Sequence, residues 1–326
     1  MRVLIIGGGG FIGQKIARSL AKSGTLKGET ITHLALADLA VPADVEAPFP
    51  VSLHAVDIAD AASIAPLFTG ETAPDVIFHL AAVVSGQAEA EFDLGMKVNL
   101  MGSINVLEAA RAMGTCPVIV FSSSCAVYGG EIPDQIEDHT QLNPQTSYGA
   151  QKAAVELLVT DYSRKGFIDG RAPRLPTVTV RPGKANAAAS SFMSSIAREP
   201  LQGEEAIVPV EPDYALWYAS PRVVVANLIK CAEVPTEALG ENRAFALPGQ
   251  TTTVAQMIED IRTVAGDEPV SRIKFQPDER ILAIVTGWKA YINPQKALAL
   301  GLTADNSFED SVRYFLEDDI RPADKG

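Results

Sequence analysis

A tyrosine and a lysine four residues apart, Tyr148 and Lys152, carry the clearest potential for chemistry in this chain. On a helix this spacing places both side chains on one face. An ammonium beside a phenol favours the phenolate and lowers a phenol pKa that is ordinarily about 10. Such a phenolate can take the proton from a substrate hydroxyl. Ser124, at the end of a serine-rich stretch, adds a hydroxyl that can hold the substrate oxygen.

A glycine-rich turn near the N-terminus offers a second kind of chemistry, the binding of a pyrophosphate. Its glycines follow an apolar run and open a helical pattern as GxxGxxG, which permits a tight turn, close backbone approach and helix–strand packing. Amides at the start of the helix can then hold the anion. The alternative is a glycine-rich turn without a ligand. The residues expected at this turn are Gly7, Gly10, Phe11, Ile12 and Gly13.

An acidic residue, Asp38, closes the second apolar run. A carboxylate there accepts hydrogen bonds from both hydroxyls of an adenosine ribose and repels a 2′-phosphate. No Arg or Lys occurs among the next eight residues, which favours NAD over NADP. The alternative is a solvated surface acid.

Two further strand ends are expected to contact the dinucleotide. An acid and a neighbouring amide after the third strand can read the adenine edge, although a helix N-cap also explains Asp60 and competes for Asp57. Small residues after the fourth strand let the dinucleotide lie against the backbone. The nicotinamide ribose is expected near the tyrosine and lysine. The expected contacts are Asp57, Ile58, Leu80, Ala81, Ala82, Ser122, Tyr148 and Lys152.

Short apolar runs alternate with segments in which apolar residues recur three and four positions apart. This order predicts a doubly wound α/β fold with a parallel Rossmann-type sheet, because parallel strands require crossover helices. The expected helices include Phe11–Lys22, Val98–Met113 and Tyr148–Tyr162. The expected strands are Arg2–Ile6, Ile31–Ala37, Val51–Val56, Val76–Leu80, Val118–Ser122 and Thr177–Arg181.

The pattern changes after Arg181, where prolines and an Ala/Ser-rich stretch interrupt it. Residues 1–181 are therefore expected to form the NAD-binding domain, with 222–250 returning to it. Residues 182–221 and 251–326 are expected to form a smaller, interleaved α/β domain that binds the substrate.

Composition excludes several classes of protein. The formal net charge of −13, without a basic run, argues against nucleic-acid binding. Three scattered cysteines predict neither a disulfide framework nor a metal site. We expect no signal peptide and no membrane span, and hence a cytoplasmic protein.

Together, the glycine turn, Asp38 and the Ser124, Tyr148 and Lys152 set resemble the extended short-chain dehydrogenase/reductase family, also called the NAD-dependent epimerase/dehydratase family. The resemblance implies that Ser124, Tyr148 and Lys152 form a catalytic triad, and it implies a homodimer. It also implies that Asn99, in Val98-Asn-Leu-Met-Gly102, supports a water relay or contacts near the cofactor. The segment that meets the nicotinamide carboxamide is expected to contain Pro182 and Gly183.

Departures from the family pattern bear on the substrate. Nucleotide-sugar members carry an arginine that binds the diphosphate where this chain reads Asp213-Tyr-Ala-Leu-Trp-Tyr-Ala-Ser220. The stretches Val83-Val-Ser-Gly-Gln-Ala-Glu-Ala-Glu-Phe92 and Arg181-Pro-Gly-Lys-Ala-Asn186-Ala-Ala-Ala-Ser190 instead resemble members that act on four-carbon sugar acids.

That resemblance implies NAD-dependent oxidation at C2 of D-erythronate or a close analogue. The alternatives are a nucleotide-sugar epimerase or dehydratase and a non-enzymatic NAD-sensing regulator, which can lack the tyrosine and lysine. A small anionic substrate needs a cation and polar partners. The residues expected to hold it are Ser85, Gly86, Ser124, Tyr148, Lys184 and Asn186.

Overall fold

The computed structural model describes residues 1–183 and 189–320. The chain forms two compact units, each built from separate stretches. The first contains 1–124, 146–174 and 225–245, and the second contains the remaining residues. The sequence placed 125–145 in the first domain, whereas the contacts within the fold group this stretch with the second unit.

The first unit contains a doubly wound sheet, as the sequence predicted. Its strand order is β14-β10-β7-β6-β1-β4-β5, with β8 paired to β10. β1 lies between β4 and β6 and pairs parallel with both, so the order of strands reverses direction at β1. In open α/β sheets, ligands bind at this reversal, outside the carboxyl ends of the strands. The strands are β1 (Arg2–Ile6), β4 (His33–Asp38), β5 (Val51–Ala55), β6 (Val76–His79), β7 (Val118–Phe121), β8 (Ser123–Ser124), β10 (Asp169–Leu175) and β14 (Ala244–Ala246).

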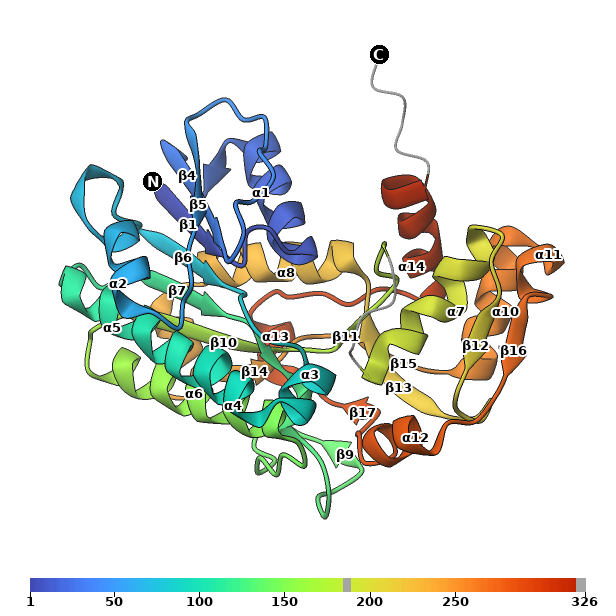
Figure 1. Cartoon of the computed structure of the whole chain (residues 1–326). Helices are drawn as coiled ribbons and strands as arrows, with labels where there is room; N and C mark the ends of the chain where they lie inside the picture. The colour runs from blue at the N-terminus through green and yellow to red at the C-terminus, as the bar shows by residue number, and fades with distance from the viewer. Residues whose placement is uncertain (184–188, 321–326) are drawn as a thin grey trace. The chain divides into compact units, whose positions relative to one another are not determined.

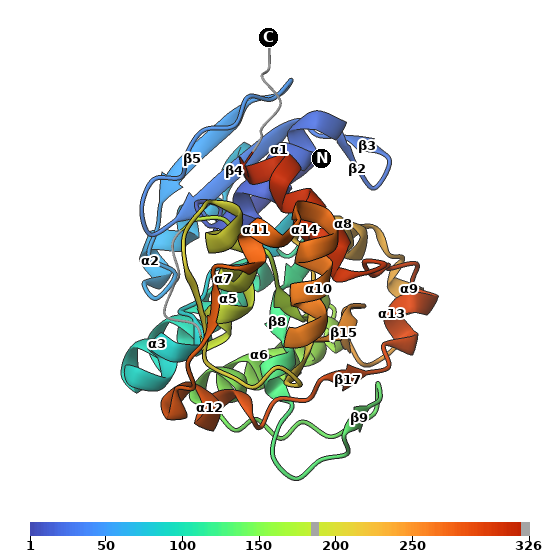
Figure 2. The same cartoon turned by 90° about the vertical axis from the view of Figure 1, so that its right-hand side faces the viewer.

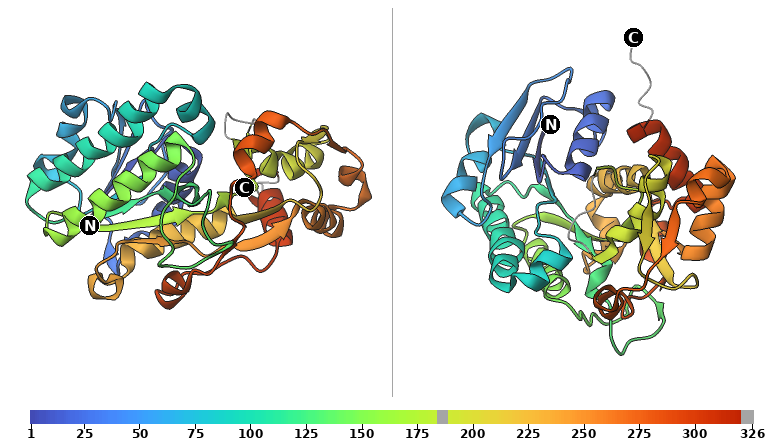
Figure 3. Two further views of the ribbon diagram at one scale, coloured as in Figure 1. Left: turned by 90° about the horizontal axis from the view of Figure 1, so that it is seen from below. Right: turned by 45° about the vertical axis from the view of Figure 1, so that its right-hand side comes forward.

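Helices cover both faces of this sheet (Figures 1 and 3). α5 and α6 lie side by side on one face, while α1 lies on the other (Figure 1). The helices and small elements of the unit are α1 (Phe11–Ser23), β2 (Thr25–Leu26), β3 (Glu29–Thr30), α2 (Ala61–Ile64), η1 (Ala65–Phe68), η2 (Gly70–Thr72), α3 (Ser85–Ala90), α4 (Phe92–Gly95), the π-helix η3 (Met96–Gly102), α5 (Ser103–Met113), α6 (Ser147–Arg164) and α9 (Thr236–Leu239).

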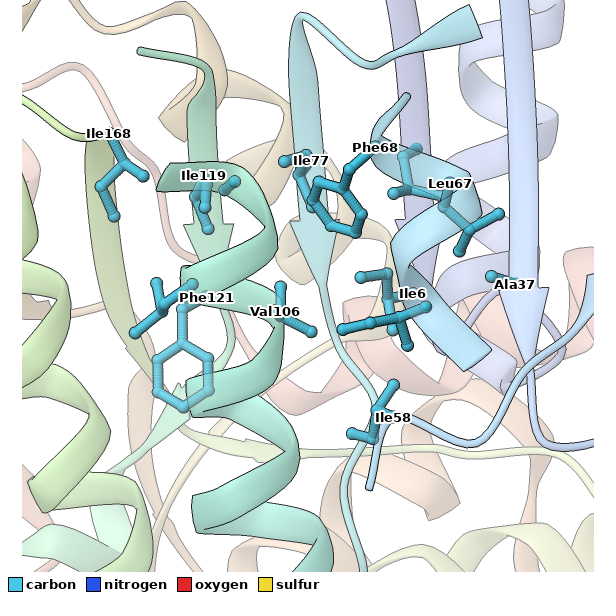
Figure 4. Packing of buried hydrophobic residues seen from close by; sticks show 14 of the residues in the cluster. Ile6, Ala37, Ile58, Leu67, Phe68, Ile77, Val106, Ile119, Phe121 and Ile168 are labelled. Atoms are coloured by element: carbon cyan, nitrogen blue, oxygen red, sulfur yellow. The ribbon is translucent and has the colours of Figure 1, made fainter. Parts of the chain in front are cut away.

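Apolar side chains of the sheet and its covering helices form the core of the first unit. Val106 on α5 packs toward the sheet near Ile77 and Phe121, as Figure 4 shows. These three side chains are fully buried, which removes their apolar surface from water. This close packing fixes the position of α5 relative to the carboxyl ends of β6 and β7.

One strand expectation was wrong. The sequence placed the sixth strand of the sheet at Thr177–Arg181, whereas β10, which pairs parallel with β7, is Asp169–Leu175. The strand contains two arginines and a proline, so its sequence does not show the apolar run expected of a buried strand. Both arginines are nonetheless buried, at 0% and 4% exposure for Arg171 and Arg174, because each finds acceptors inside the fold.

The second unit has its own core and small sheets. β13 pairs parallel with β11 and antiparallel with β15. Figure 2 shows α10 beside α14, and both contribute buried residues to this core. Its elements are η4 (Cys125–Val127), β9 (Gln135–Ile136), β11 (Thr177–Val178), η5 (Ala189–Ser191), α7 (Phe192–Leu201), β12 (Ala206–Val208), β13 (Ala215–Ala219), β15 (Gln250–Thr253), α10 (Val254–Ala265), α11 (Asp267–Val270), β16 (Ile273–Phe275), α12 (Glu279–Val285), β17 (Tyr291–Ile292), α13 (Gln295–Ala299), α14 (Phe308–Phe315) and η6 (Leu316–Ile320), and α8 (Pro221–Glu233) is shared between the units.

Candidate active site

The glycine turn joins β1 to α1 at the carboxyl edge of the sheet. Gly7 has a φ of 89°, and a Cβ there would lie 2.7 Å from the amide nitrogen of Ala81. A Cβ on Gly13 would overlap the carbonyl oxygen of Gly7. Only glycine therefore allows the turn to lie against the loop after β6 and under the first turn of α1. Gly10, which is exposed, caps α1 without a side-chain acceptor for the helix amides, and Phe11 and Ile12 follow it, half-buried.

Asp38 ends β4 directly beside the glycine turn. One carboxylate oxygen accepts from the amide of Gly9 at 3.0 Å, and the other accepts from the amide of Leu39 at 2.8 Å. The carboxylate is therefore fixed in direction while it remains partly accessible. Each carboxylate oxygen accepts more than one hydrogen bond, so capacity remains for two ribose hydroxyls.

The strand ends expected at the adenine and along the dinucleotide lie on the same unit. Asp57 accepts from the amide of Ala59 at 2.9 Å and faces Lys97 at 3.9 Å, and Ile58 is buried. Asp60 caps α2 by accepting from the amide of Ala62, which confirms the capping explanation for that residue. After β6, the residues Leu80, Ala81 and Ala82 are partly buried.

Helix α6 positions the tyrosine and the lysine. The side chain of Thr146 caps it by accepting from the amide of Gly149, which fixes the start of the helix at Ser147, the residue before Tyr148. Tyr148 and Ser124 are partly exposed, whereas Lys152 is 2% exposed. The Lys152 ammonium lies 5.6 Å from the centre of the Tyr148 ring. Tyr148 and Ser124 are thus accessible to a substrate, while the buried Lys152 places a positive charge beside Tyr148.

The buried Lys152 ammonium contacts a backbone carbonyl and an aromatic ring. Its Nζ donates to the carbonyl oxygen of Ser122 at 2.8 Å and lies 4.6 Å from the centre of the Phe121 ring. Burial lowers the pKa of Lys152 to about 7, and the Glu156 carboxylate opposes this shift. The ammonium is therefore poised near neutral pH, where general acid–base groups work most effectively.

A buried histidine lies close to the same cation. His79, at the end of β6, has one ring nitrogen 2.9 Å from the hydroxyl of Ser103, and its ring packs 5.5 Å from that of Phe121. Burial lowers the pKa of His79 to about 3, and the Lys152 charge adds to the shift. His79 is therefore neutral near pH 7 and serves the packing of the strand ends.

Asn99 lies in the π-helix η3 and is buried. Its side chain accepts from the amide of Val83 at 2.7 Å, donates to the Val83 carbonyl at 3.1 Å and donates to Gln151 at 2.8 Å. Gly95 makes room for Gln151, since a Cβ there would lie 2.7 Å from its amide nitrogen. Asn99 thus ties the loop after β6 to α6. π-Helical turns occur often at functional sites, and the catalytic role of Asn99 stays a prediction.

Sequence reasoning missed a buried ion pair beside the triad. Glu156 lies one turn after Lys152 on α6. Both of its carboxylate oxygens accept hydrogen bonds from the guanidinium of Arg174 on β10, with N–O distances of 2.8 to 3.1 Å. The Glu156 side chain also accepts from the hydroxyl of Ser123. The four-residue spacing from Lys152 is a signal that the sequence does carry. Arg174 could not be found from the sequence, because its strand was not recognised.

The residues still to be placed come from several stretches of the chain: Ser85, Gly86, Lys184 and Asn186, expected at the substrate, and Pro182 and Gly183, expected at the nicotinamide carboxamide. Ser85 and Gly86 begin α3 in the first unit and are partly buried. Pro182 and Gly183 belong to the second unit, and Gly183 is exposed with a φ of 81°. Lys184 and Asn186 lie outside the residues that the structure describes.

The NAD dependent epimerase/dehydratase family matches residues 3–215, more than half of the chain. The chain belongs to this family, which confirms the resemblance drawn from its motifs, and NAD is the family's cofactor.

Particular relatives narrow the comparison. The chain is 48% identical to a D-erythronate dehydrogenase of Cupriavidus necator, over 98% of each chain. It is 43% identical to a D-erythronate dehydrogenase of Haemophilus influenzae, over 98% of this chain and 100% of the relative. Among solved structures, it superposes with a TM-score of 0.94 on a nucleoside-diphosphate-sugar epimerase from Agrobacterium tumefaciens, at 42% identity over 99% of this chain and 95% of that one.

Proposed function

We propose that this protein oxidises the C2 hydroxyl of D-erythronate to 2-oxo-D-erythronate with NAD. The observation that carries the proposal is the 48% identity to a D-erythronate dehydrogenase over nearly the whole of both chains. The grouping of Tyr148, Ser124 and buried Lys152 on one unit supports it, because oxidation of an alcohol requires a group that removes the hydroxyl proton.

The first unit fits NAD by its shape and by its donors. Gly7 and Gly13 allow the tight turn, since a Cβ at either position would collide with neighbouring backbone, and the amides at the start of α1 are not capped by a side chain. The fixed carboxylate of Asp38 suits two ribose hydroxyls rather than a phosphate. NAD, when bound, supplies the hydride acceptor. We assign the first unit to NAD and the second to the substrate.

The chain's own residues divide the proton chemistry. Tyr148, as phenolate, takes the proton from the substrate hydroxyl, and the Lys152 ammonium stabilises that phenolate. Ser124 donates to the substrate oxygen and orients it. We assign the substrate carboxylate to Lys184 and Asn186, and the remaining hydroxyls to Ser85 and Gly86 on α3.

A nucleotide-sugar epimerase is the second candidate, and the 42% identity to the structure from Agrobacterium tumefaciens favours it. An epimerase would use the same triad without net change in its cofactor. Residues 213–220 lack the arginine expected for a diphosphate, and Ala215–Ala219 instead forms the mostly buried strand β13. This weighs toward the sugar acid.

Assembly and location form the last part of the proposal. A homodimer through α5 and α6 is supported by Leu157, which is 68% exposed on α6, and by Met101, which is 49% exposed beside α5. Among the described residues, no helix is long and apolar enough to cross a membrane. We place the enzyme in the cytoplasm.

The test is a spectrophotometric assay at 340 nm with D-erythronate and either NAD or NADP. We expect reduced cofactor with NAD and far less with NADP. No turnover of any aldonate in a four-carbon panel would refute the proposal. Conversion of a UDP-sugar without net NADH would establish the epimerase instead.

A further inference from the structure

We propose that the buried Glu156–Arg174 pair positions the reaction centre: Glu156 keeps Lys152 charged beside Tyr148 and, through Ser123, fixes the strand end that carries Ser124. This inference rests on the proposed function and adds two positioning residues to it. Neither Glu156 nor Arg174 touches the reacting atoms. Both act through the residues that do.

Geometry is the first support. Three consecutive residues at the end of β7 and in β8 bind one face of α6. The ring of Phe121 and the carbonyl of Ser122 contact Lys152, and the hydroxyl of Ser123 donates to Glu156 one turn later. The next residue is Ser124. Because α6 also carries Tyr148, these contacts fix the tyrosine and the serine relative to each other.

Charge is the second support. Glu156 and Arg174 are 2% and 4% exposed, so neither charge is solvated by water. Together with the Lys152 ammonium they make a buried group with a net charge of +1. Ionisation of Tyr148 brings this group to neutrality, which favours the phenolate in a medium of low polarity.

The position of the carboxylate sets the direction of its effect. Glu156 lies one helical turn from Lys152 and two turns from Tyr148. It therefore stabilises the ammonium more than it opposes the phenolate. Without it, burial would lower the pKa of Lys152 further, so the ammonium would be lost at a lower pH and the Tyr148 phenolate would lose its positive neighbour.

Other titratable groups on the elements packed against α6 have different partners. His79 on β6 is neutral, as described above. The remaining groups are Glu89 on α3, which accepts from the amide of Ser147, exposed Asp93 on α4, Lys97 on η3, which faces Asp57, and Glu108 on α5, which binds Arg111 and Tyr162. Among the described residues of α6 and of the elements packed against it, Glu156 is the buried carboxylate one helical turn from Lys152.

The decisive experiment is a pH titration of the phenolate absorbance at 295 nm in the NAD-bound protein. Each protein is measured against its own Tyr148→Phe counterpart, so that the other tyrosines cancel. Glu156→Gln keeps the shape of the side chain and removes its charge. We expect it to raise the pH midpoint of the Tyr148 signal by about one unit or more. The double variant Glu156→Gln/Arg174→Met removes the positive charge of Arg174 as well and should recover part of the shift.

Asp169→Asn is the matched control. Asp169 lies at the opposite end of β10 and pairs with Arg171 and Arg243, so the variant likewise removes the carboxylate partner of a buried arginine on the same strand. We expect its midpoint to equal that of the wild type. An unchanged midpoint in Glu156→Gln, or a double variant shifted as far as the single one, would overturn the inference.

The titration needs no substrate, so its outcome is separate from that of the proposed function. If the wild type fails to oxidise D-erythronate but Glu156→Gln shifts the midpoint, the proposed substrate is wrong and the positioning role stands. If the wild type is active, Glu156→Gln should lower kcat and move its pH optimum upward while KM changes less than about threefold. An equal rise in KM with an unmoved pH profile would count against positioning.

Discussion

Two regions of the same sheet form their sites in different ways. They are the glycine end, at β1 and β4, and the charged end, at β7 and β10. At the β1–β4 end, Gly7 and Gly13 create the site by the absence of side chains, and one carboxylate, Asp38, is held by backbone amides. At the β7–β10 end, the site depends on buried charges from distant segments, with Lys152 and Arg174 as the cations. The first end presents backbone to a ligand, and the second sets the protonation state of side chains.

The difference predicts how each end fails. A substitution at the glycine end should act through shape and be insensitive to pH. A substitution at the charged end should act through proton equilibria and be sensitive to pH. The following experiments test that division.

Tyr148→Phe removes the proposed base and leaves the ring in place. We expect kcat with D-erythronate to fall by about 10²- to 10⁴-fold, because general-base catalysis contributes in that range. The affinity for NAD, measured by fluorescence titration, should change less than about threefold. A variant that retains comparable turnover would show that Tyr148 is not the base.

Gly13→Ala places a Cβ against the Gly7 carbonyl oxygen. We expect the free energy of unfolding to fall by about 1–3 kcal/mol and NAD binding to weaken at least about tenfold at every pH tested, because the turn must widen. Denaturant unfolding and NAD titration measure the two effects. Gly287→Ala, at a position with open space around it, is the control. A pH-dependent loss of affinity would contradict a purely steric role.

His79, at the end of β6, is a buried group close to Lys152, and His79→Gln tests how its protonation affects the free energy of unfolding. Native His79 stays neutral down to about pH 3, whereas an unfolded histidine binds a proton below about pH 6.5. The unfolded state therefore gains protons as the pH falls through this window, and the native state loses stability. We expect His79 to account for about 3 kcal/mol of the loss between pH 6.5 and pH 4.

The measurement compares denaturant unfolding of the wild type and of His79→Gln at both pH values. The variant should show the smaller decrease on acidification. His139→Gln, at an exposed position, should behave like the wild type. Equal acid sensitivity of the wild type and His79→Gln would contradict a neutral buried histidine.

Asp38→Ala should have the smallest effect, on cofactor choice rather than on rate. Loss of the carboxylate removes the proposed ribose acceptors and the repulsion of a 2′-phosphate. We expect the ratio of kcat/KM for NAD to that for NADP to fall by about tenfold, since each hydrogen bond to a charged group contributes about 1.5–3 kcal/mol. The ratio should be the same at pH 7 and pH 9. Unchanged selectivity would rule out the ribose role.

Sequence patterns alone predicted the glycine turn and five strands of the sheet. The apolar runs predicted β1, β4, β5, β6 and β7 within a few residues, and the turn that follows β1 was read directly. These features are local, because a glycine turn and an apolar strand can each be predicted from consecutive residues. The Tyr148 and Lys152 spacing is local in the same sense, because a helix translates a separation of four residues into a shared face.

The buried arginines of the charged end depend on contacts between segments that are distant in the chain. A pattern based on hydrophobicity treats Arg171 and Arg174 as surface residues and therefore misses β10. In the fold, Arg171 donates to the carbonyls of Cys231 and Val234, and Arg174 pairs with Glu156. Burial of a charge becomes tolerable only when partners from distant segments meet it. Those partners are defined by packing, so Arg174 could be identified as the partner of Glu156 only from the folded chain.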